Sequence, residues 1–181
     1  MQTADGMQAL CPRESRSVHT YVTVVQPGDG ATIAEVRALL EEYLSWLGPL
    51  VCSSTLPAEI ATLPQPYASP HGALLVARDD AGATLGCVGV RESESDACEV
   101  KRLYVRTDAR RRGIGRVLVR AAMDQARAMG YREMRLTTVP DEMTGVQILY
   151  ESLGFTVADP YRHHGGQPVD GVRLIYMSRP L

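Results

Sequence analysis

Apolar and polar residues follow two different spacings along the chain, and each spacing predicts a type of element. Residues 19–25 are rich in β-branched and aromatic side chains, which is typical of a strand. Over residues 32–47 the apolar side chains recur every three or four positions, which predicts a helix with one buried face. Thr32 is followed three residues later by Glu35, so we expect a capping box to begin this helix at Thr32.

The next stretch, residues 48–72, carries five prolines and predicts an irregular segment with one short helix over residues 58–63. Irregular segments of this length are usually functional or disordered. Beyond it, strands are predicted over residues 73–78, 84–91, 98–105, 132–138, 155–158 and 172–178, and helices over residues 113–129 and 144–153. This order of elements indicates an α/β domain with one central sheet and no internal repeat.

The length of the chain indicates one compact domain preceded by a short leader. Of its 181 residues, 45% are hydrophobic and 22% are charged, so a normal globular core can form. Residues 1–17 mix charged and small side chains without an apolar signal-peptide core, and we expect them to be a flexible leader. Residues 18–181 are expected to form the domain, and no apolar run approaches the ~20 residues that span a bilayer.

Charge and cysteine content exclude several functional classes. The net charge of -2 does not suit a protein that coats nucleic acid or an anionic membrane, so neither is expected as a partner. The four cysteines, Cys11, Cys52, Cys87 and Cys98, form no CxxC or CxxH pair, so no zinc site is expected. They are typical of free thiols in a reducing compartment, which predicts a cytoplasmic location.

A basic, glycine-containing segment between a predicted strand and a predicted helix carries the candidate chemistry. Arg110, Arg111 and Arg112 precede Gly113-Ile114-Gly115, which open the helix. A helix N-terminus presents free N–H groups and partial positive charge, and glycine lets a ligand approach the backbone, so the segment predicts a phosphate site. No Lys-Ser/Thr pair follows the glycines, and Leu118 replaces the third glycine of a dinucleotide fingerprint, so neither nucleotide-binding motif is present.

The same six residues resemble the Arg/Gln-x-x-Gly-x-Gly/Ala signature of the GNAT (GCN5-related N-acetyltransferase) family. A second element, residues 149–155, is similar to a later Leu-Tyr-x-x-x-Gly-Phe element of that family, and so is the predicted order of elements over residues 19–179. The resemblance implies the GNAT acyltransferase fold, an α/β fold whose single mixed, mostly antiparallel central sheet is flanked by helices. It also implies acetyl-CoA as cosubstrate and an amine as acceptor.

The resemblance assigns roles to particular residues. Those implied to bind the coenzyme A pyrophosphate, through backbone N–H groups, are Arg110, Arg111, Arg112, Gly113, Ile114 and Gly115. Those implied to pair through the main chain with the pantetheine arm are Leu103, Tyr104 and Val105. Tyr150 occupies the position of a tyrosine that protonates the leaving thiolate. Many members carry an asparagine where this chain has Met143, so one polar contact to the coenzyme is expected to be missing.

Two of the implied site residues keep a structural alternative. Tyr150 is implied as the general acid, but core-forming side chains surround it in the sequence, and packing alone is the alternative. An ammonium acceptor must lose a proton before it attacks, and Glu99 lies where several family members place a base. Its alternative is a salt bridge with Lys101 or Arg102.

The resemblance implies that residues 49–72 and 161–170 line the acceptor site. Tyr67 and Tyr43 could border it, and the alternative for Tyr43 is a place in the buried face of its helix. His163 and His164 stand beside Asp170 in a predicted loop with glycines and a proline, a composition more typical of solvated or substrate-facing histidines than of a metal site. No metal is therefore expected.

The expected activity is direct transfer of an acetyl group from acetyl-CoA to an amine acceptor, either a small molecule or a peptide. The alternative is an acyl-CoA-binding regulatory module without turnover. The sequence does not decide whether the protein forms a homodimer.

Overall fold

The computed structural model describes residues 20–24, 29–47, 55–94, 96–139, 144–161 and 174–181. The leader expected over residues 1–17 lies outside them. The helices are α1 (Gly30–Leu47), α2 (Leu56–Ala61), α3 (Ile114–Ala128) and α4 (Thr144–Ser152), with 3-10 turns at Gln65–Tyr67 and Thr107–Ala109. The strands are β1 (Thr20–Val24), β2 (Gly72–Asp79), β3 (Thr84–Glu94), β4 (Ala97–Val105), β5 (Glu133–Thr138), β6 (Thr156–Val157) and β7 (Ile175–Pro180).

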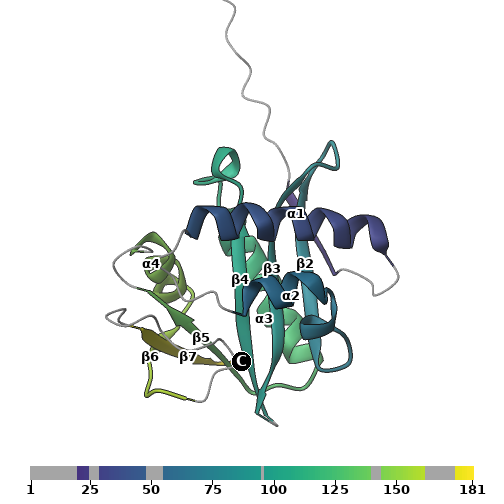
Figure 1. The fold of residues 1–181 in the computed structure, drawn as a ribbon. Coiled ribbons are helices and arrows are strands. Elements are labelled where there is room, and N and C mark those ends of the chain that lie inside the picture. Colours follow the sequence, from purple (N-terminus) through teal and green to yellow (C-terminus); the bar gives the residue numbers. More distant parts are fainter. Residues whose placement is uncertain (1–19, 25–28, 48–54, 95, 140–143, 162–173) are drawn as a thin grey trace, which may run out of the picture.

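The strands that the structure describes form one sheet of seven in the order β1-β2-β3-β4-β5-β7-β6. β4 and β5 run parallel, and the other neighbouring pairs are antiparallel. Helices α1 and α2 cross one face of the sheet, and α3 lies behind the other (Figure 1). The predicted α/β fold, with a mixed, mostly antiparallel sheet flanked by helices, is confirmed.

Side-chain alternation along the strands divides the core into two layers. In β2, Leu74 and Val76 are buried against the side of α1 and α2, whereas Leu75 belongs to the layer that packs on α3. Val36 and Leu40 of α1 are 0% exposed, which confirms the buried helix face predicted from their spacing.

The capping box predicted at Thr32 is wrong. Helix α1 begins at Gly30, and the Asp29 carboxylate accepts a hydrogen bond from the Thr32 N–H at 3.0 Å, so Asp29 is the capping residue. Glu35 instead forms an ion pair with Arg78, with 2.6 Å between Oε2 and Nη1. Two side chains of the type that caps helices stand close together here, and the sequence alone does not rank them.

Most other boundaries differ from the prediction by one to three residues. The short helix predicted over residues 58–63 is α2, two residues earlier, and β7 ends at Pro180. β3 continues to Glu94 because Glu94 still pairs with Ala97 of β4, so ladder hydrogen bonds override a polar sequence. Among the described residues, no helix is long and apolar enough to cross a bilayer.

Candidate active site

A cavity of about 630 Å³ lies where β4 and β5 separate. Residues Ala97–Glu99 of β4 pair with Glu133–Arg135 of β5, and beyond this short ladder β5 runs away from β4 (Figure 1). The cavity lining includes most of the residues implied to hold the coenzyme, together with the implied acid: Leu103, Tyr104, Val105, Arg110, Arg111, Gly113, Ile114, Gly115 and Tyr150. Arg112 and Glu99 are not among the lining residues.

The loop before α3 presents backbone N–H groups that have no acceptor. Arg111 and Gly113 have φ angles of 63° and 80°, so the loop curls tightly before the helix. Within the part of the chain that the structure describes, no hydrogen bond occupies the N–H groups of residues 111–115. A Cβ placed on Gly113 would meet no atom within 4 Å, so the space beside the loop is open. Such a turn at the positive end of a helix can bind a phosphate.

The three arginines of this loop lie differently. Arg110 donates from Nε to the Val105 carbonyl at 3.1 Å, and its guanidinium lies 4.8 Å from the ring centre of Trp46. Arg112 donates to the carbonyl oxygen of Asp108 at 2.7 Å, outside the cavity lining. Arg111 is exposed at the cavity, so its charge is the most accessible of the three to a ligand.

The edge of β4 that faces β5 has no strand partner beyond Glu99. The main chain of residues 103–105 is therefore open to an extended ligand, which can add to the sheet as a further strand. A bulge precedes these residues: Gly89 pairs with Lys101 and Cys87 with Tyr104, which leaves one extra residue on β4.

Tyr150 lies on α4, is 5% exposed and lines the cavity. Its ring packs edge-on against Phe155, with the ring centres 5.4 Å apart. Burial raises the pKa of the Tyr150 phenol, so the hydroxyl stays protonated at neutral pH. The hydroxyl makes no hydrogen bond to the described residues, so the ring can pack while the hydroxyl remains available to a ligand.

Thr138, at the end of β5, is a site residue that the sequence analysis missed. It is 6% exposed and lines the cavity, and its hydroxyl has no hydrogen-bond partner among the residues described. An unpartnered buried hydroxyl destabilises a protein by about 1–3 kcal/mol. A ligand that bonds to Thr138 would remove this penalty.

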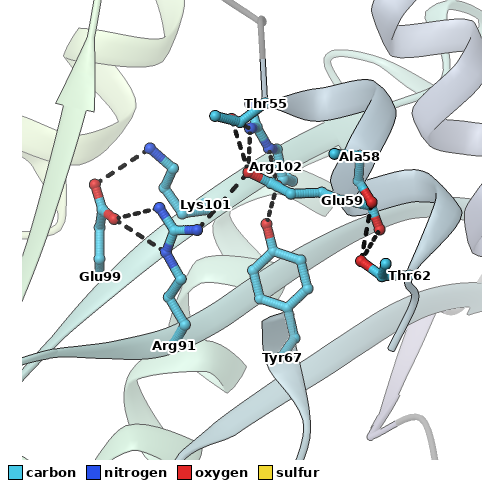
Figure 2. Close-up of polar contacts among 9 residues, drawn as sticks. All are labelled: Thr55, Ala58, Glu59, Thr62, Tyr67, Arg91, Glu99, Lys101 and Arg102. Carbon is cyan, nitrogen blue, oxygen red and sulfur yellow. Dashed lines mark hydrogen bonds and ion pairs between the residues drawn. The ribbon is translucent and has the colours of Figure 1, made fainter. Parts of the chain in front are cut away.

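A set of buried charged side chains, called here the charge cluster, lies between α2 and β4 (Figure 2). Its members are Glu59, Arg91, Glu99, Lys101 and Arg102. Arg91 bridges the two carboxylates, at 3.0 Å from Glu99 and 3.7 Å from Glu59. Lys101 Nζ lies 3.2 Å from Glu99 Oε1, and Arg102 donates to Glu59 from both Nε and Nη2 at 2.8 Å.

The cluster holds both carboxylates ionised. Burial alone would raise the pKa of Glu99, but the charges of Lys101 and Arg91 outweigh it and lower that pKa below its usual value. Burial likewise opposes ionisation of Glu59, yet its bonds to Arg102 bring its pKa to about 2. A lowered pKa makes a carboxylate a weaker base. The geometry of Glu99 therefore favours the salt-bridge alternative, with Lys101 as one expected partner and Arg91 in place of Arg102.

Replacing Glu59 with Gln is expected to destabilise the fold by about 3–5 kcal/mol, because Arg102 is left buried without its counter-charge. Folding lowers the pKa of Glu59 from 4.5 to about 2, so the stability it contributes is complete above about pH 5 and is lost as the pH falls toward 2. Urea unfolding at pH 7 and pH 3 measures both effects.

The control for this prediction is Glu35→Gln, since Glu35 is 44% exposed in its ion pair and such pairs contribute about 1 kcal/mol or less. The wild type should lose more stability between pH 7 and pH 3 than Glu59→Gln does. Equal losses in the two proteins would contradict the assignment.

The two tyrosines considered for the acceptor site differ in outcome. Tyr67 is wrong as an acceptor contact: it is 1% exposed, its hydroxyl donates to Glu59 at 2.7 Å, and its ring fills the space over Gly89. Tyr43 lines the cavity and packs against Tyr104 with ring centres 5.4 Å apart.

Of the residues expected between 161 and 170 at the acceptor site, Tyr161 is described. Its hydroxyl donates to Glu99 at 3.4 Å, so it borders the charge cluster. His163, His164 and Asp170 lie outside the described residues. No group of three His, Cys, Asp or Glu side chains able to hold a metal occurs in the described part of the chain.

Trp46 and Ile148 are further cavity residues that the sequence analysis missed. They line the cavity yet are 46% and 60% exposed. Both are large apolar side chains on the outer face of a helix, and exposed apolar residues of this kind often mark a binding surface. Large apolar residues at positions outside the buried face of a helix are the signal that could have identified them.

Comparison with known proteins agrees with this geometry. Residues 70–157 match the family model described as "Acetyltransferase (GNAT) domain". An uncharacterized N-acetyltransferase of Schizosaccharomyces pombe is 36% identical over 144 residues, which cover 79% of this chain and 85% of the relative. An IAA acetyltransferase of Azospirillum brasilense is 34% identical over 149 residues, which cover 81% of this chain and 90% of the relative.

A solved structure gives the same fold at lower identity. The GCN5-related N-acetyltransferase from Kribbella flavida has a TM-score of 0.70 and 23% sequence identity, with 90% of this chain and 98% of that chain covered. The two relatives, the matching family model and the cavity between the diverging strands lead to one conclusion. The chain belongs to the GNAT family of acetyl-CoA-dependent N-acetyltransferases.

Proposed function

We propose that the protein transfers the acetyl group of acetyl-CoA directly to an amine, with Tyr150 as the acid. The observation that carries the proposal is one cavity lined by the glycine loop before α3, by the open edge of β4 and by Tyr150. Acetyl-CoA, when bound, supplies a thioester that an amine can attack. The chain's own residues bind it, orient it and protonate the thiolate that leaves.

The residues present fit coenzyme A. The free N–H groups of residues 111–115 suit a pyrophosphate, and the accessible guanidinium of Arg111 adds charge. The open edge of β4 over residues 103–105 suits the pantetheine arm. The unpartnered hydroxyl of Thr138 suits an amide of that arm and would replace the contact expected to be missing at Met143.

Thr138→Val is expected to weaken coenzyme A binding by about tenfold, the worth of one hydrogen bond. Thermal stability without ligand should stay the same or rise, because the hydroxyl that the substitution removes has no hydrogen-bond partner among the described residues. Calorimetric titration with coenzyme A and a melting curve measure the two effects. Ser93→Ala is the matched control. Among the described residues, Ser93 carries the other buried hydroxyl without a hydrogen-bond partner, and it lies outside the cavity. Unchanged affinity of Thr138→Val would remove Thr138 from the site.

The resemblance implies Glu99 as the general base. Its buried ion pairs with Arg91 and Lys101 instead favour a role in positioning other side chains. Its side chain is 0% exposed and does not line the cavity. It holds the Lys101 ammonium at the cavity wall and accepts a hydrogen bond from Tyr161. We propose that Glu99 acts through these two side chains.

The two cysteines that the structure describes favour direct transfer over an acetyl-cysteine intermediate. Cys87 and Cys98 are free and buried, and burial raises the pKa of both thiols to about 12, so little thiolate forms at neutral pH. Free buried thiols also suit a reducing compartment, and we propose that the protein is cytoplasmic.

A panel of small amines and short peptides, incubated with acetyl-CoA, tests the proposal through release of free thiol. We expect at least one acceptor to release coenzyme A well above the rate of hydrolysis without acceptor. Tight coenzyme binding with no release for any amine would favour the regulatory module instead. Light scattering on the same sample decides between a monomer and a homodimer.

A further inference from the structure

The charge cluster carries more positive than negative charge. Its three cations, on Arg91, Lys101 and Arg102, face two carboxylates, so its formal charge is +1 (3 − 2). None of the five side chains is more than 11% exposed. Among the described residues, no third carboxylate pairs with these cations. Buried charge is destabilising unless it is balanced, so the cluster can accept one more anion.

Lys101 is the member of the cluster that can meet this anion. It lines the cavity, which Arg91 does not. Its ammonium has three donors, and among the described residues Glu99 Oε1 alone accepts from it, at 3.2 Å. Arg102 also lines the cavity, but it is bonded to Glu59 twice and to Thr55. Burial, with the charges of Arg102 and Arg91, outweighs Glu99 and lowers the pKa of Lys101.

The missing anion is not the coenzyme pyrophosphate. Lys101 stands four residues before Val105, the last residue of β4, and the glycine loop follows beyond that strand end. At about 3.3 Å per residue, Lys101 lies roughly 13 Å along the strand from the end that leads into the loop. With the phosphates at the loop, the Lys101 end of the cavity is left for the acetyl group and the acceptor.

We propose, building on the acetyltransferase function above, that the acceptor is an amine that also carries a carboxylate, bound by the Lys101 ammonium. An α-amino acid is the simplest member of this class. An acceptor with positive charge alone, such as a polyamine, would be repelled by a cluster that is already positive. Lys101 is then a specificity-determining residue whose ion pair with the carboxylate completes the cluster.

The test compares a panel of α-amino acids, each as the free acid, the carboxamide and the decarboxylated amine, in acetyl-CoA-dependent thiol release. For the best acid, kcat/KM of the wild type should exceed that of its carboxamide by about 10- to 100-fold, the range for a hydrogen bond to a charged group. Carboxamides and decarboxylated amines that react as fast as the acids would overturn the proposal. If no amine of the panel released thiol from acetyl-CoA, the result would contradict the acetyltransferase function itself.

Lys101→Met should lower kcat/KM on the acid by about 10- to 100-fold more than it lowers kcat/KM on the carboxamide, so that the preference for the acid is lost. Arg120→Met removes the same charge from an exposed position outside the cavity and should keep the preference. Equal losses on the acid and the carboxamide in a folded Lys101→Met protein would assign Lys101 to another role and sink the proposal.

A binding measurement on the wild type decides the question without turnover or a variant. Lys101 is the only lysine of the sequence, so protein labelled with ¹³C at lysine Cε gives one lysine signal. With coenzyme A present, the free acids of the panel should shift this signal and raise the pH at which it titrates. The carboxamides should do neither. No shift with any free acid would overturn the proposal.

Discussion

Tyr150→Phe is expected to lower kcat by about 10²–10⁴, the usual contribution of a positioned general acid. The thiolate that leaves the thioester gains a proton as it departs, and the Tyr150 hydroxyl is protonated at neutral pH because burial raises its pKa. The variant keeps the ring that packs on Phe155, so stability and acetyl-CoA affinity should change by no more than a few-fold. An effect confined to kcat is typical of an interaction made in the transition state.

Steady-state kinetics on the best acceptor measure this effect, and Tyr131→Phe is the matched control. Tyr131 is 7% exposed, and its hydroxyl donates to the His71 carbonyl at 2.8 Å outside the cavity. Tyr131→Phe should therefore lose stability but not kcat. A near-normal kcat for Tyr150→Phe would leave packing as the role of Tyr150.

Gly113→Val is expected to weaken coenzyme A binding by about 10²-fold or more. Gly113 stands at φ 80° directly before α3, and the open space at its Cβ position is where we place the pyrophosphate. A branched side chain would fill that space and separate the phosphate from several N–H groups, each worth about 1.5–3 kcal/mol to a charged ligand. Calorimetric titration with coenzyme A measures the loss.

The control for Gly113 is Gly130→Val, at φ 90° and also without atoms near its Cβ position, at the opposite end of α3. Both variants carry the strain of a positive φ, about 1–2 kcal/mol, but Gly130 is outside the cavity lining. Gly130→Val should lose stability and keep affinity. A folded Gly113→Val protein with unchanged affinity would exclude the loop as the phosphate site.

The features that the sequence predicts well are local in the chain. The glycine loop is predictable because six consecutive residues supply both the turn and the helix start, and the buried face of α1 because its spacing is regular. The cap of α1 is not, because Asp29 and Thr32 are both capping residue types and only the backbone conformation selects one.

The charge cluster could not be predicted from the sequence because its partners are distant along the chain. Arg102 binds Glu59, 43 residues earlier, and their meeting depends on how α2 lies over β4. Glu99 was expected beside Lys101 or Arg102, but the bulge in β4 sends Arg102 to Glu59, and Arg91 of the neighbouring strand takes its place. Thr138 was missed because an unpartnered hydroxyl is visible only when its surroundings are known.

Mass spectrometry of a single turnover tests the central claim most directly. The enzyme is mixed first with acetyl-CoA alone and then with the best acceptor of the panel. Direct transfer predicts no acetyl adduct on the enzyme in the first step, and one acetyl group on the acceptor nitrogen with free coenzyme A in the second. An acetyl group on Cys87 or Cys98 that the acceptor then removes would contradict the account, and so would an acceptor that stays unmodified while coenzyme A is bound.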